Sequence, residues 1–542
     1  MHGLMQEIPL MISSLIRYAA EYHGDRPVVS RTVEGPIHRY GYAECERRAR
    51  RVAGLMGRLG VRQGERVGTL AWNGHRHLEL FYGVSGMGAV LHTVNPRLFT
   101  EQIVYIINHA EDRVLFVDLT FVELVERIAN QLSTVEHVVV MTDEEHMPET
   151  SLPNVSCYET LLAGESEDYA WPLFDERAAS SLCYTSGTTG NPKGVLYSHR
   201  STLLHAMAAC QNSAMGISAH DVLMPIAPMY HGNAWSLPYL GCLSGAGLVL
   251  PGTKMDGQSL QELIEGEGVT FALGVPTVFT MLIDHLDESG KQVESLERVA
   301  IGGSAVPRSM IERLADPYGV TVHQLWGMTE TSPLGTMATA TPAIDALGAE
   351  ERRAVLAQQG RVQFGLELAI TGEDGAPVPR DGKTFGDMWV RGNWAASGYF
   401  KGEGGDRLDE DGWFPTGDVA TLDTHGFMRI TDRTKDVIKS GGEWISSIDL
   451  ENAAMGHPDV KQAAVIGVFH PKWEERPLMV VVPRDGRSPD KETINGYLAG
   501  KVAKWWLPDD VVLVDELPLT ATGKIQKSRL REMFEDYRLP DA

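Results

Sequence analysis

Residues 184–195 read Tyr-Thr-Ser-Gly-Thr-Thr-Gly-Asn-Pro-Lys-Gly-Val and follow directly on a buried-looking run that ends at Cys183. Glycine tolerates positive φ, so the N–H groups of such a loop can turn toward one anion. The hydroxyls add donors and Lys193 adds a positive charge, which together predict a phosphate-binding loop. The loop departs from the Walker pattern, because Gly194 follows the lysine and leaves no hydroxyl there to hold a metal ion. A flexible polar loop is the plain alternative for this stretch taken alone.

The composition narrows the class of protein. A chain of 542 residues with 43% apolar and 22% charged residues is typical of a soluble protein of several units. Its net charge of −24 argues against nucleic acid or an anionic membrane as the main partner. The five cysteines are scattered without a Cys-x-x-Cys pair, which favours a reducing compartment. No apolar run approaches the ~20 residues of a membrane span. We therefore expect a cytoplasmic protein with no integral-membrane segment.

The order of the segments predicts an α/β fold with two domains. Short apolar strands alternate with helical patterns over the first 350 residues, for example at 66–72, 114–118, 137–141, 247–250 and 298–301. Such alternation is typical of stacked, mostly parallel sheets. Short strands with Gly-Asp turns predict a β-rich subdomain from about 361 to 432. We expect a large domain over residues 1–432 and a small α/β domain over 433–542.

Two charged stretches are predicted to be surface helices. Residues 343–360 are rich in Ala, Glu and Arg. The run Arg47-Arg48-Ala49-Arg50-Arg51 lies in an amphipathic pattern over residues 42–59. A charge run is usually a solvated face, and an interface is the alternative for the second stretch.

Four further segments carry residues suited to chemistry. Residues 324–330 (Gln-Leu-Trp-Gly-Met-Thr-Glu) combine an aromatic ring that can stack on a purine with a carboxylate that can bind Mg²⁺. Residues 411–418 end in Asp418, which could accept both hydroxyls of a ribose, and residues 432–444 are rich in charge. Lys524 lies on a glycine-containing loop. Taken singly, these are also a core tryptophan beside a surface glutamate, an Asx turn, a solvated face and a surface lysine.

In this order the segments resemble the adenylate-forming superfamily, which includes acyl-CoA synthetases, luciferases and nonribosomal adenylation domains. The resemblance runs from about residue 25 to 535. It is strongest to the bacterial fatty-acid–CoA ligase branch that also holds the methylmercaptopropionate–CoA ligases, through segments 72–79, 95–98, 233–239 and 504–508. It implies a ligase that uses ATP, Mg²⁺ and coenzyme A to make an acyl-adenylate and then an acyl-CoA thioester.

The resemblance also implies roles at the nucleotide. Thr185, Ser186, Gly187, Thr188, Thr189, Gly190 and Lys193 would hold the β- and γ-phosphates, with Thr185 near the metal ion. Gly303 and Ser304 would pass along the adenine, and Gln324, Leu325 and Trp326 would flank it. Tyrosine is usual at position 326, and tryptophan keeps the stacking face while it loses the hydroxyl. Thr329 would contact the α-phosphate, Glu330 would bind Mg²⁺, and Asp418 with its neighbour Arg433 would bind the ribose.

Lys524 matches the lysine that bridges the substrate carboxylate and the α-phosphate, and His231 matches the residue near that carboxylate. Lys435 sits at the hinge position of the family, about which the small domain rotates between the two half-reactions. Lys439 and Trp444 resemble the segment that faces the active site after this rotation.

The acid is expected to lie between residues 231–239 and the strand that ends at Gly302. Trp235 resembles the tryptophan that closes the acyl tunnel of long-chain ligases, although a packed core tryptophan is the alternative. Gly302 and Gly303 would leave room in the wall, and Pro333 would line it. No lysine or arginine in these segments could receive a second carboxylate. An aliphatic monocarboxylate, of medium chain length first, is the predicted substrate, with long-chain acids and methylmercaptopropionate as alternatives.

Two other functions remain open from the sequence. One is an adenylating enzyme that passes its acyl group to an amine or a carrier-protein thiol. The other is a silent ATP-binding regulator, although the chain keeps both Lys524 and Glu330. By analogy with the branch we expect a homodimer.

Overall fold

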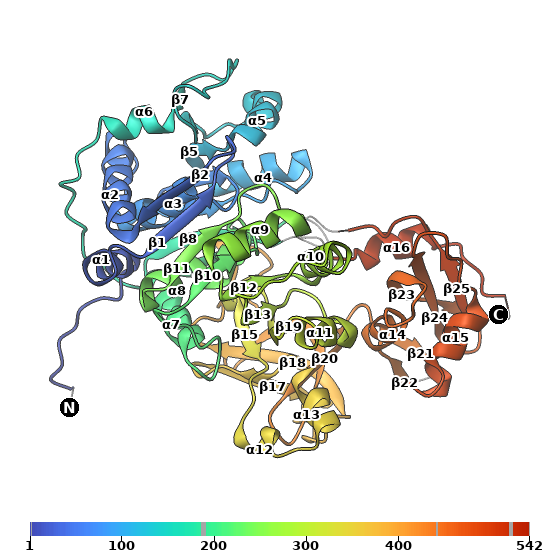
Figure 1. Ribbon diagram of the computed structural model, residues 1–542. Helices are drawn as coiled ribbons and strands as arrows, with labels where there is room; N and C mark the ends of the chain where they lie inside the picture. Colours follow the sequence, from blue (N-terminus) through green and yellow to red (C-terminus); the bar gives the residue numbers. More distant parts are fainter. Residues whose placement is uncertain (2, 186–190, 441–442, 520–523, 541–542) are drawn as a thin grey trace.

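The computed structural model describes residues 1, 3–185, 191–440, 443–519 and 524–540. Figure 1 shows a large assembly of sheets and helices, with the last hundred or so residues forming a separate lobe (α14–α16 with β21–β25). In the part of the chain that is described, no helix has the length and apolar character needed to cross a membrane.

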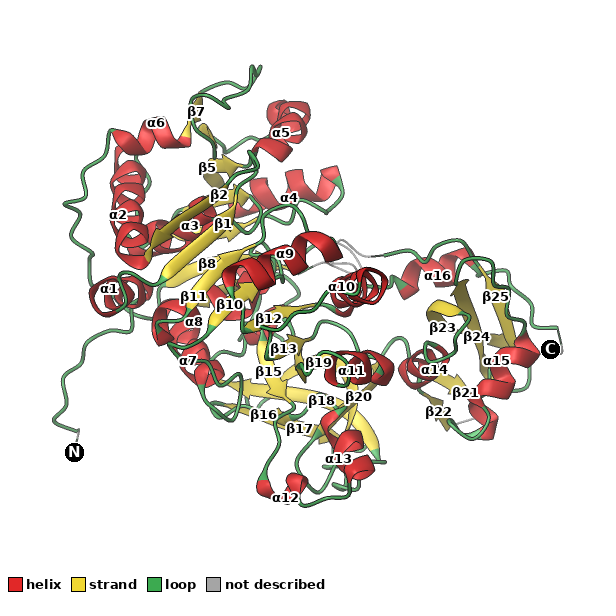
Figure 2. Ribbon diagram, in the orientation of Figure 1, coloured by secondary structure: helices red, strands yellow, loops and turns green. Residues whose placement is uncertain are grey.

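Residues 27–362 contain two mainly parallel sheets (Figure 2). The seven-stranded sheet has the order β7 (Val155–Cys157), β6 (His137–Val140), β5 (Asp112–Val117), β3 (Arg66–Leu70), β4 (Val90–Thr93), β8 (Ala179–Tyr184) and β9 (Gly194–Ser198). The nine-stranded sheet has the order β16 (Arg361–Val362), β15 (Leu334–Met337), β14 (Thr321–Gly327), β13 (Arg298–Ile301), β12 (Phe271–Gly274), β10 (Val222–Pro225), β11 (Gly247–Leu250), β1 (Pro27–Arg31) and β2 (Ile37–Gly41). The pairs β8/β9, β1/β2, β14/β15 and β15/β16 are antiparallel.

Helices cover these sheets because their apolar residues recur at helical spacing. On the helix over Tyr42–Arg58 (α2), for example, Cys45, Ala49, Val52 and Met56 are buried. The main helices are α1 (Ile12–Tyr22), α2, α3 (His75–Gly86), α4 (Thr100–Ala110), α5 (Val122–Ile128), α6 (Tyr158–Ala163), α7 (His199–Cys210), α8 (Leu237–Ser244), α9 (Gly257–Glu267), α10 (Pro276–Ser289) and α11 (Arg308–Ala315). The largest apolar cluster combines residues of α1, α2, α3, α7 and α8 with strands of both sheets. The prediction of stacked, helix-covered sheets is confirmed.

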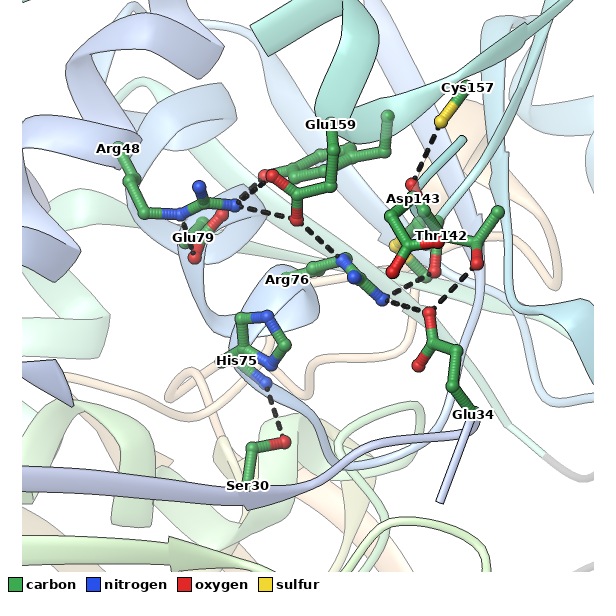
Figure 3. A network of polar contacts seen from close by, with 12 residues as sticks. Ser30, Glu34, Arg48, His75, Arg76, Glu79, Thr142, Asp143, Cys157 and Glu159 are labelled. Atoms are coloured by element: carbon green, nitrogen blue, oxygen red, sulfur yellow. Dashed lines mark hydrogen bonds and ion pairs between the residues drawn. The ribbon is translucent and has the colours of Figure 1, made fainter. Parts of the chain in front are cut away.

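The arginine run in α2 differs from its prediction as a solvated face. Figure 3 shows Arg48 and Arg76 bridging the glutamates that surround them. Arg48 Nε lies 2.7 Å from Glu79 Oε1, on a carboxylate that is fully buried, and its Nη2 lies 2.9 Å from Glu159 Oε1. Arg76 continues the network to Glu159 and Glu34. Arg48 is therefore part of the packing between α2, α3 and α6, because a buried carboxylate needs a charged partner.

The predicted β-rich subdomain is a four-stranded antiparallel sheet of β17 (Leu366–Thr371), β18 (Phe385–Gly392), β19 (Phe414–Leu422) and β20 (Met428–Arg433). The single helix expected over 343–360 is wrong. The segment forms two short helices, α12 (Pro342–Asp345) and α13 (Ala349–Leu356), because residues 346–348 leave the helical conformation between them.

The C-terminal lobe has its own sheet and its own core. The strands β21 (Ile438–Ser440), β22 (Glu443–Ile445), β23 (Val460–His470), β24 (Glu474–Pro483) and β25 (Asp510–Leu513) pair only with one another among the described residues. The helices α14 (Ser447–Ala454), α15 (Lys491–Leu498) and α16 (Lys527–Met533) pack on this sheet.

Candidate active site

The ends of the predicted phosphate loop are pinned by backbone pairing. Tyr184 of β8 lies opposite Gly194 of β9. One residue further, Thr185 N–H donates to Lys193 O at 2.9 Å, and Lys193 N–H donates to Thr185 Oγ1 at 3.2 Å. Thr185 and Lys193 therefore close the base of the loop. Ser186, Gly187, Thr188, Thr189 and Gly190 lie outside the described residues.

The Asp418 carboxylate is held by two donors from different sheets. Trp326 Nε1–H donates to its Oδ2 at 2.8 Å, and Arg433 Nε lies 2.8 Å from its Oδ1. Asp418 lies inside β19, directly opposite Arg433 of β20, so strand register brings this ion pair together. A turn precedes the strand, where Gly412 N–H donates to Asp409 O at 3.1 Å, so the Asx turn considered from the sequence does not lie at Asp418 itself. The carboxylate is only 3% exposed, and its orientation is set before any ligand arrives.

Trp326 is packed more deeply than is expected of a ring that stacks on a base. The residue is 8% exposed, and its ring lies against the backbone of Gly335, where an added Cβ would overlap it. It belongs to an apolar cluster with β17, β18 and β19. Its N–H group also gives position 326 a polar role, because it donates to the Asp418 carboxylate.

The side chains of Gln324 and Leu325 make contacts within the protein. Gln324 Nε2–H donates to Ala357 O, and its Oε1 accepts from Gln359 Nε2 at 3.0 Å. Leu325 fills the space beside Gly302, where an added Cβ would overlap the Leu325 side chain. The interpretation that Gly302 leaves room for the acid is therefore wrong, because Leu325 occupies that room.

Thr329 and Glu330 begin a short turn, η4 (Thr329–Thr331), just after β14. Tyr197 O–H donates to Thr329 O at 2.7 Å. Glu330 is 7% exposed, and its Oε1 accepts from the Tyr399 hydroxyl at 2.7 Å. A buried carboxylate whose hydrogen-bond donor is a neutral hydroxyl suits a hard cation.

The oxygen donors here fit Mg²⁺, which needs few protein ligands. They do not fit a metal ion whose ligands all come from the protein. Among the described residues there is no group of three or more His, Cys, Asp or Glu that could hold a metal ion. Mg²⁺ keeps several waters and binds one or two carboxylates together with substrate phosphates. The Glu330 carboxylate and the Thr185 hydroxyl could supply the protein ligands of such an ion.

Lys524 reaches from the C-terminal lobe into this site. Its Cε would lie 3.6 Å from a Cβ on Gly303, a residue with φ of +85°. Burial first, and the charge of Arg433 second, lower the pKa of the Lys524 ammonium to about 8 against the opposing effect of Asp418 and Glu330. Lys524 therefore lies close to Asp418, Arg433 and Glu330, which the sequence analysis assigned to the ribose and to the metal ion.

His231 lies close enough to Lys524 for the ammonium charge to lower its pKa. Burial first, and the Lys524 ammonium second, lower the pKa of His231 to about 4. The imidazole is neutral at physiological pH and can hydrogen-bond to a carboxylate without adding charge. Ser304, on the loop after β13, is exposed.

The segment after His231 takes an unusual backbone conformation. Residues 232–236 all have positive φ, with values of 51°, 45°, 52°, 55° and 67° in chain order. This left-handed region costs about 1–2 kcal/mol for each residue that has a Cβ. Trp235, in the middle of this left-handed turn, is 6% exposed and packs in the largest apolar cluster.

Side-chain hydrogen bonds hold the left-handed turn. Asn233 Nδ2 donates to Ser181 Oγ at 2.7 Å, and the Cys183 thiol donates to Asn233 Oδ1 at 3.2 Å. His205 Nε2 accepts from Leu334 N–H at 3.0 Å, so its Nδ1–H donates to Ser236 Oγ at 2.6 Å. The turn is thereby tied both to β8, which leads into the phosphate loop, and to β15.

Pro333 meets the same turn, since a Cβ on Gly232 would lie 3.3 Å from Pro333 Cγ. His231 thus precedes this turn, Trp235 lies in it and Pro333 packs against it. Their role at the acid remains a prediction. The residues that the sequence analysis missed are Tyr399, Asn233 and His205. Only Gly232-Asn233, a pair that tolerates positive φ, could have signalled the turn.

Lys435 lies between two differently anchored neighbours. Thr434 N–H donates to Gly417 O at 3.0 Å and Thr434 Oγ1 to Asp387 Oδ1 at 3.1 Å, both in the β-rich subdomain. Asp436 Oδ1 lies 2.7 Å from Arg531 of α16. Lys439 pairs with Trp444 across β21 and β22, and its N–H donates to Glu475 Oε2 at 2.9 Å.

Comparison with known proteins agrees with this geometry. A family model for the AMP-binding enzyme matches residues 16–400, and one for the AMP-binding enzyme C-terminal domain matches residues 449–524. The chain is 51% identical over 536 residues to a 3-methylmercaptopropionyl-CoA ligase of Ruegeria lacuscaerulensis, with 99% of each chain covered. It is 48% identical over 543 residues to a medium-chain-fatty-acid–CoA ligase of Ectopseudomonas oleovorans, covering 99% of this chain and 98% of that one.

The fold is similar to that in the crystal structure of the anthranilate CoA ligase AuaEII in complex with anthranoyl-AMP. The TM-score is 0.87 at 24% identity, with 98% of both chains covered.

Replacing Trp326 by Phe should weaken nucleotide binding by about tenfold, because hydrogen bonds to charged groups contribute about 1.5–3 kcal/mol. The ring is retained while Asp418 loses its indole donor. Calorimetric titration with ATP measures the effect. Trp389→Phe is the matched control, since its indole donates to Thr371 Oγ1 at 3.0 Å within the β-rich subdomain that carries Asp418. Equal affinities of the two variants would contradict the role given to Trp326.

The first half-reaction should lose rate as the pH rises through about 8, because deprotonation removes the positive charge of Lys524. Exchange of labelled pyrophosphate into ATP measures this step. Bound phosphates stabilise the ammonium, so the midpoint should be higher in kcat than in kcat/KM. Lys524→Arg keeps its charge and should lack the alkaline decline. An unchanged decline in this variant would show that another group titrates.

Proposed function

Because the chain belongs to the family of AMP-binding enzymes and is an AMP-forming acid–CoA ligase, we propose that its substrate is an aliphatic monocarboxylic acid. A medium-chain fatty acid is the first choice, and 3-methylmercaptopropionate and long-chain acids are the others. The observation that carries the proposal is the buried left-handed turn around Trp235, which lies beside the predicted carboxylate-binding residue His231 and is held by neutral side chains.

The reaction has two half-reactions. The acid carboxylate first attacks the α-phosphorus of ATP, which gives an acyl-adenylate and pyrophosphate. The thiol of coenzyme A then attacks the acyl carbon and displaces AMP. Bound Mg²⁺ would neutralise phosphate charge and orient the leaving pyrophosphate.

We assign the protein groups to the first half-reaction as follows. Asp418, already oriented by Trp326 and Arg433, accepts from the ribose hydroxyls. The Lys524 ammonium lies between the carboxylate and the α-phosphate, where negative charge develops, and Thr329 donates to the same phosphate. Lys193 and the phosphate loop hold the outer phosphates, and neutral His231 donates to the substrate carboxylate. In a site shielded from water these donors are most effective because they need no reorganisation.

The polar groups around the left-handed turn favour an uncharged tail on the acid. They are the Ser181 and Ser236 hydroxyls, the Cys183 thiol, the Asn233 amide and the His205 imidazole. Burial raises the pKa of the Cys183 thiol to about 11 and lowers that of His205 to about 3, so both stay neutral. None of these five described groups is a cation that could pair with a second carboxylate, which argues against dicarboxylic substrates.

We propose that residues 1–432 and 433–542 act as two domains with Lys435 as the hinge. The separate sheet and cores of the C-terminal lobe support this division. The anchoring of Thr434 to one part and of Asp436 to the other leaves Lys435 as the residue between them. Rotation at Lys435 would withdraw Lys524 and present Lys439 and Trp444 for the thioester step.

We also propose a cytoplasmic location and a homodimer. The location is supported by five cysteines that are all free thiols. The homodimer is expected by analogy with the ligase branch, and light scattering of the purified protein tests it.

The test of the proposed function is pyrophosphate release across a panel of acids, with and without coenzyme A. The panel runs from propionate and 3-methylmercaptopropionate through octanoate to palmitate, with benzoate and succinate as controls. Turnover that needs coenzyme A and is highest with an aliphatic monocarboxylate supports the proposal. Trp235→Ala should shift the preferred chain length upward. Release without coenzyme A, with an amide as the product, would identify an amine as the acceptor.

Lys435→Pro should spare adenylation and slow thioester formation by at least tenfold, because proline fixes φ at the residue that must rotate. Pyrophosphate exchange measures the first step, and transfer from preformed acyl-adenylate to coenzyme A measures the second. Lys435→Ala is the control, since it removes the side chain but leaves the backbone free. Equal losses in both half-reactions of Lys435→Pro would argue against the hinge.

A further inference from the structure

Tyr399 contacts two charged groups that lie far apart in the sequence. Its hydroxyl donates to Glu330 Oε1 at 2.7 Å. Its ring faces Lys193, whose Nζ lies 5.0 Å from the ring centroid. A cation at this distance from an aromatic face is attracted by the ring electrons. One side chain therefore connects the carboxylate assigned to the metal with the ammonium assigned to the phosphates.

The segment that carries Tyr399 lies firmly across the base of the phosphate loop. The adjoining turn, η5 (Phe400–Gly402), places Phe400 Cβ 3.0 Å from where a Cβ on Gly194 would stand. Lys401 Nζ lies 2.6 Å from Glu111 Oε1, and Glu403 Oε1 accepts from the Tyr105 hydroxyl at 2.6 Å. These bonds to α4 and to the residue that follows it fix Tyr399 relative to the loop.

The Tyr399 ring is also confined on its other sides. It packs against Phe414 at 6.1 Å between ring centroids and against the cluster of Cys183, Val195 and Tyr197. Burial and the neighbouring Glu330 charge raise the pKa of the Tyr399 hydroxyl. The group therefore remains a hydrogen-bond donor at all physiological pH values, and its direction is fixed by packing.

We propose that Tyr399 is a positioning residue for the metal–triphosphate end of the site. Its hydroxyl sets the orientation of the Glu330 carboxylate, and its ring sets the place of the Lys193 ammonium. The two roles are separable, because the first needs only the hydroxyl and the second only the ring. This inference rests on the proposed function, since it takes Glu330 as the ligand of a metal ion bound with ATP.

The test is the affinity for ATP, measured by calorimetry with Mg²⁺ and again with EDTA. Tyr399→Phe keeps the ring and loses the hydroxyl. We expect its affinity to match the wild type in EDTA and to be about tenfold weaker with Mg²⁺, because only the metal complex depends on the Glu330 orientation. Tyr399→Leu loses both contacts and should bind ATP more weakly in both conditions.

The matched control is Tyr318→Phe, which also removes a bond between a tyrosine hydroxyl and a carboxylate. Tyr318 O–H donates to Asp287 Oδ1 at 2.6 Å on the surface of α10, and the variant should bind ATP as the wild type does. If Tyr399→Phe equals the wild type with Mg²⁺, or is weakened equally in EDTA, the proposal is overturned.

The wild-type protein separates this proposal from the proposed function. Wild-type ATP binding that does not respond to Mg²⁺, together with normal thioester formation, would overturn the role of Tyr399 alone. A wild-type protein that binds no ATP in either condition would overturn both proposals.

Discussion

The site depends on buried carboxylates that lie close to cationic groups from other parts of the fold. Lys524 comes from the C-terminal lobe, Asp418 and Arg433 from the β-rich subdomain, and Glu330 from the turn after β14. Burial disfavours the ammonium, and the two carboxylates partly offset that cost. Lys524 and these partners come from different parts of the fold, so their interaction lasts only while the C-terminal lobe lies against the rest of the chain. Under the proposed mechanism, withdrawal of Lys524 therefore requires the lobe to move.

Neutral hydrogen bonds orient the charged groups. The Trp326 indole donates to one oxygen of Asp418, and the Tyr399 hydroxyl donates to one oxygen of Glu330. On the acid side, the strained backbone of residues 232–236 is held by Asn233 and by Ser236 with His205. Backbone strain of this kind persists only where the surrounding contacts hold it in place, and it is common at binding sites. The turn and the proposed phosphate loop share a support, because Ser181 and Cys183 of β8 bond to Asn233 while the same strand leads into the loop.

Several of the proposed site groups could be named from the sequence because they depend on local chemistry. The glycines, hydroxyls and lysine of residues 184–195, and Lys524, indicate phosphate binding by their residue types alone. Tyr399 was not predictable, because its two partners are 69 and 206 positions away and no local pattern connects them. Gly302 was misread for the same reason, since the side chain that fills the space beside it belongs to the next strand.

The sequence by itself determined the family, the alternation of strands and helices, and the inventory of phosphate, ribose and metal groups, because apolar periodicity and residue type are local properties. Only the tertiary structure decided which of these groups meet and how they are turned. Arg48 is a buried partner of Glu79 instead of a solvated charge, Asp418 faces Arg433 through strand register, and five residues at Trp235 adopt a left-handed turn. These outcomes depend on contacts between segments that lie far apart in the sequence. They therefore cannot be predicted from any one segment alone.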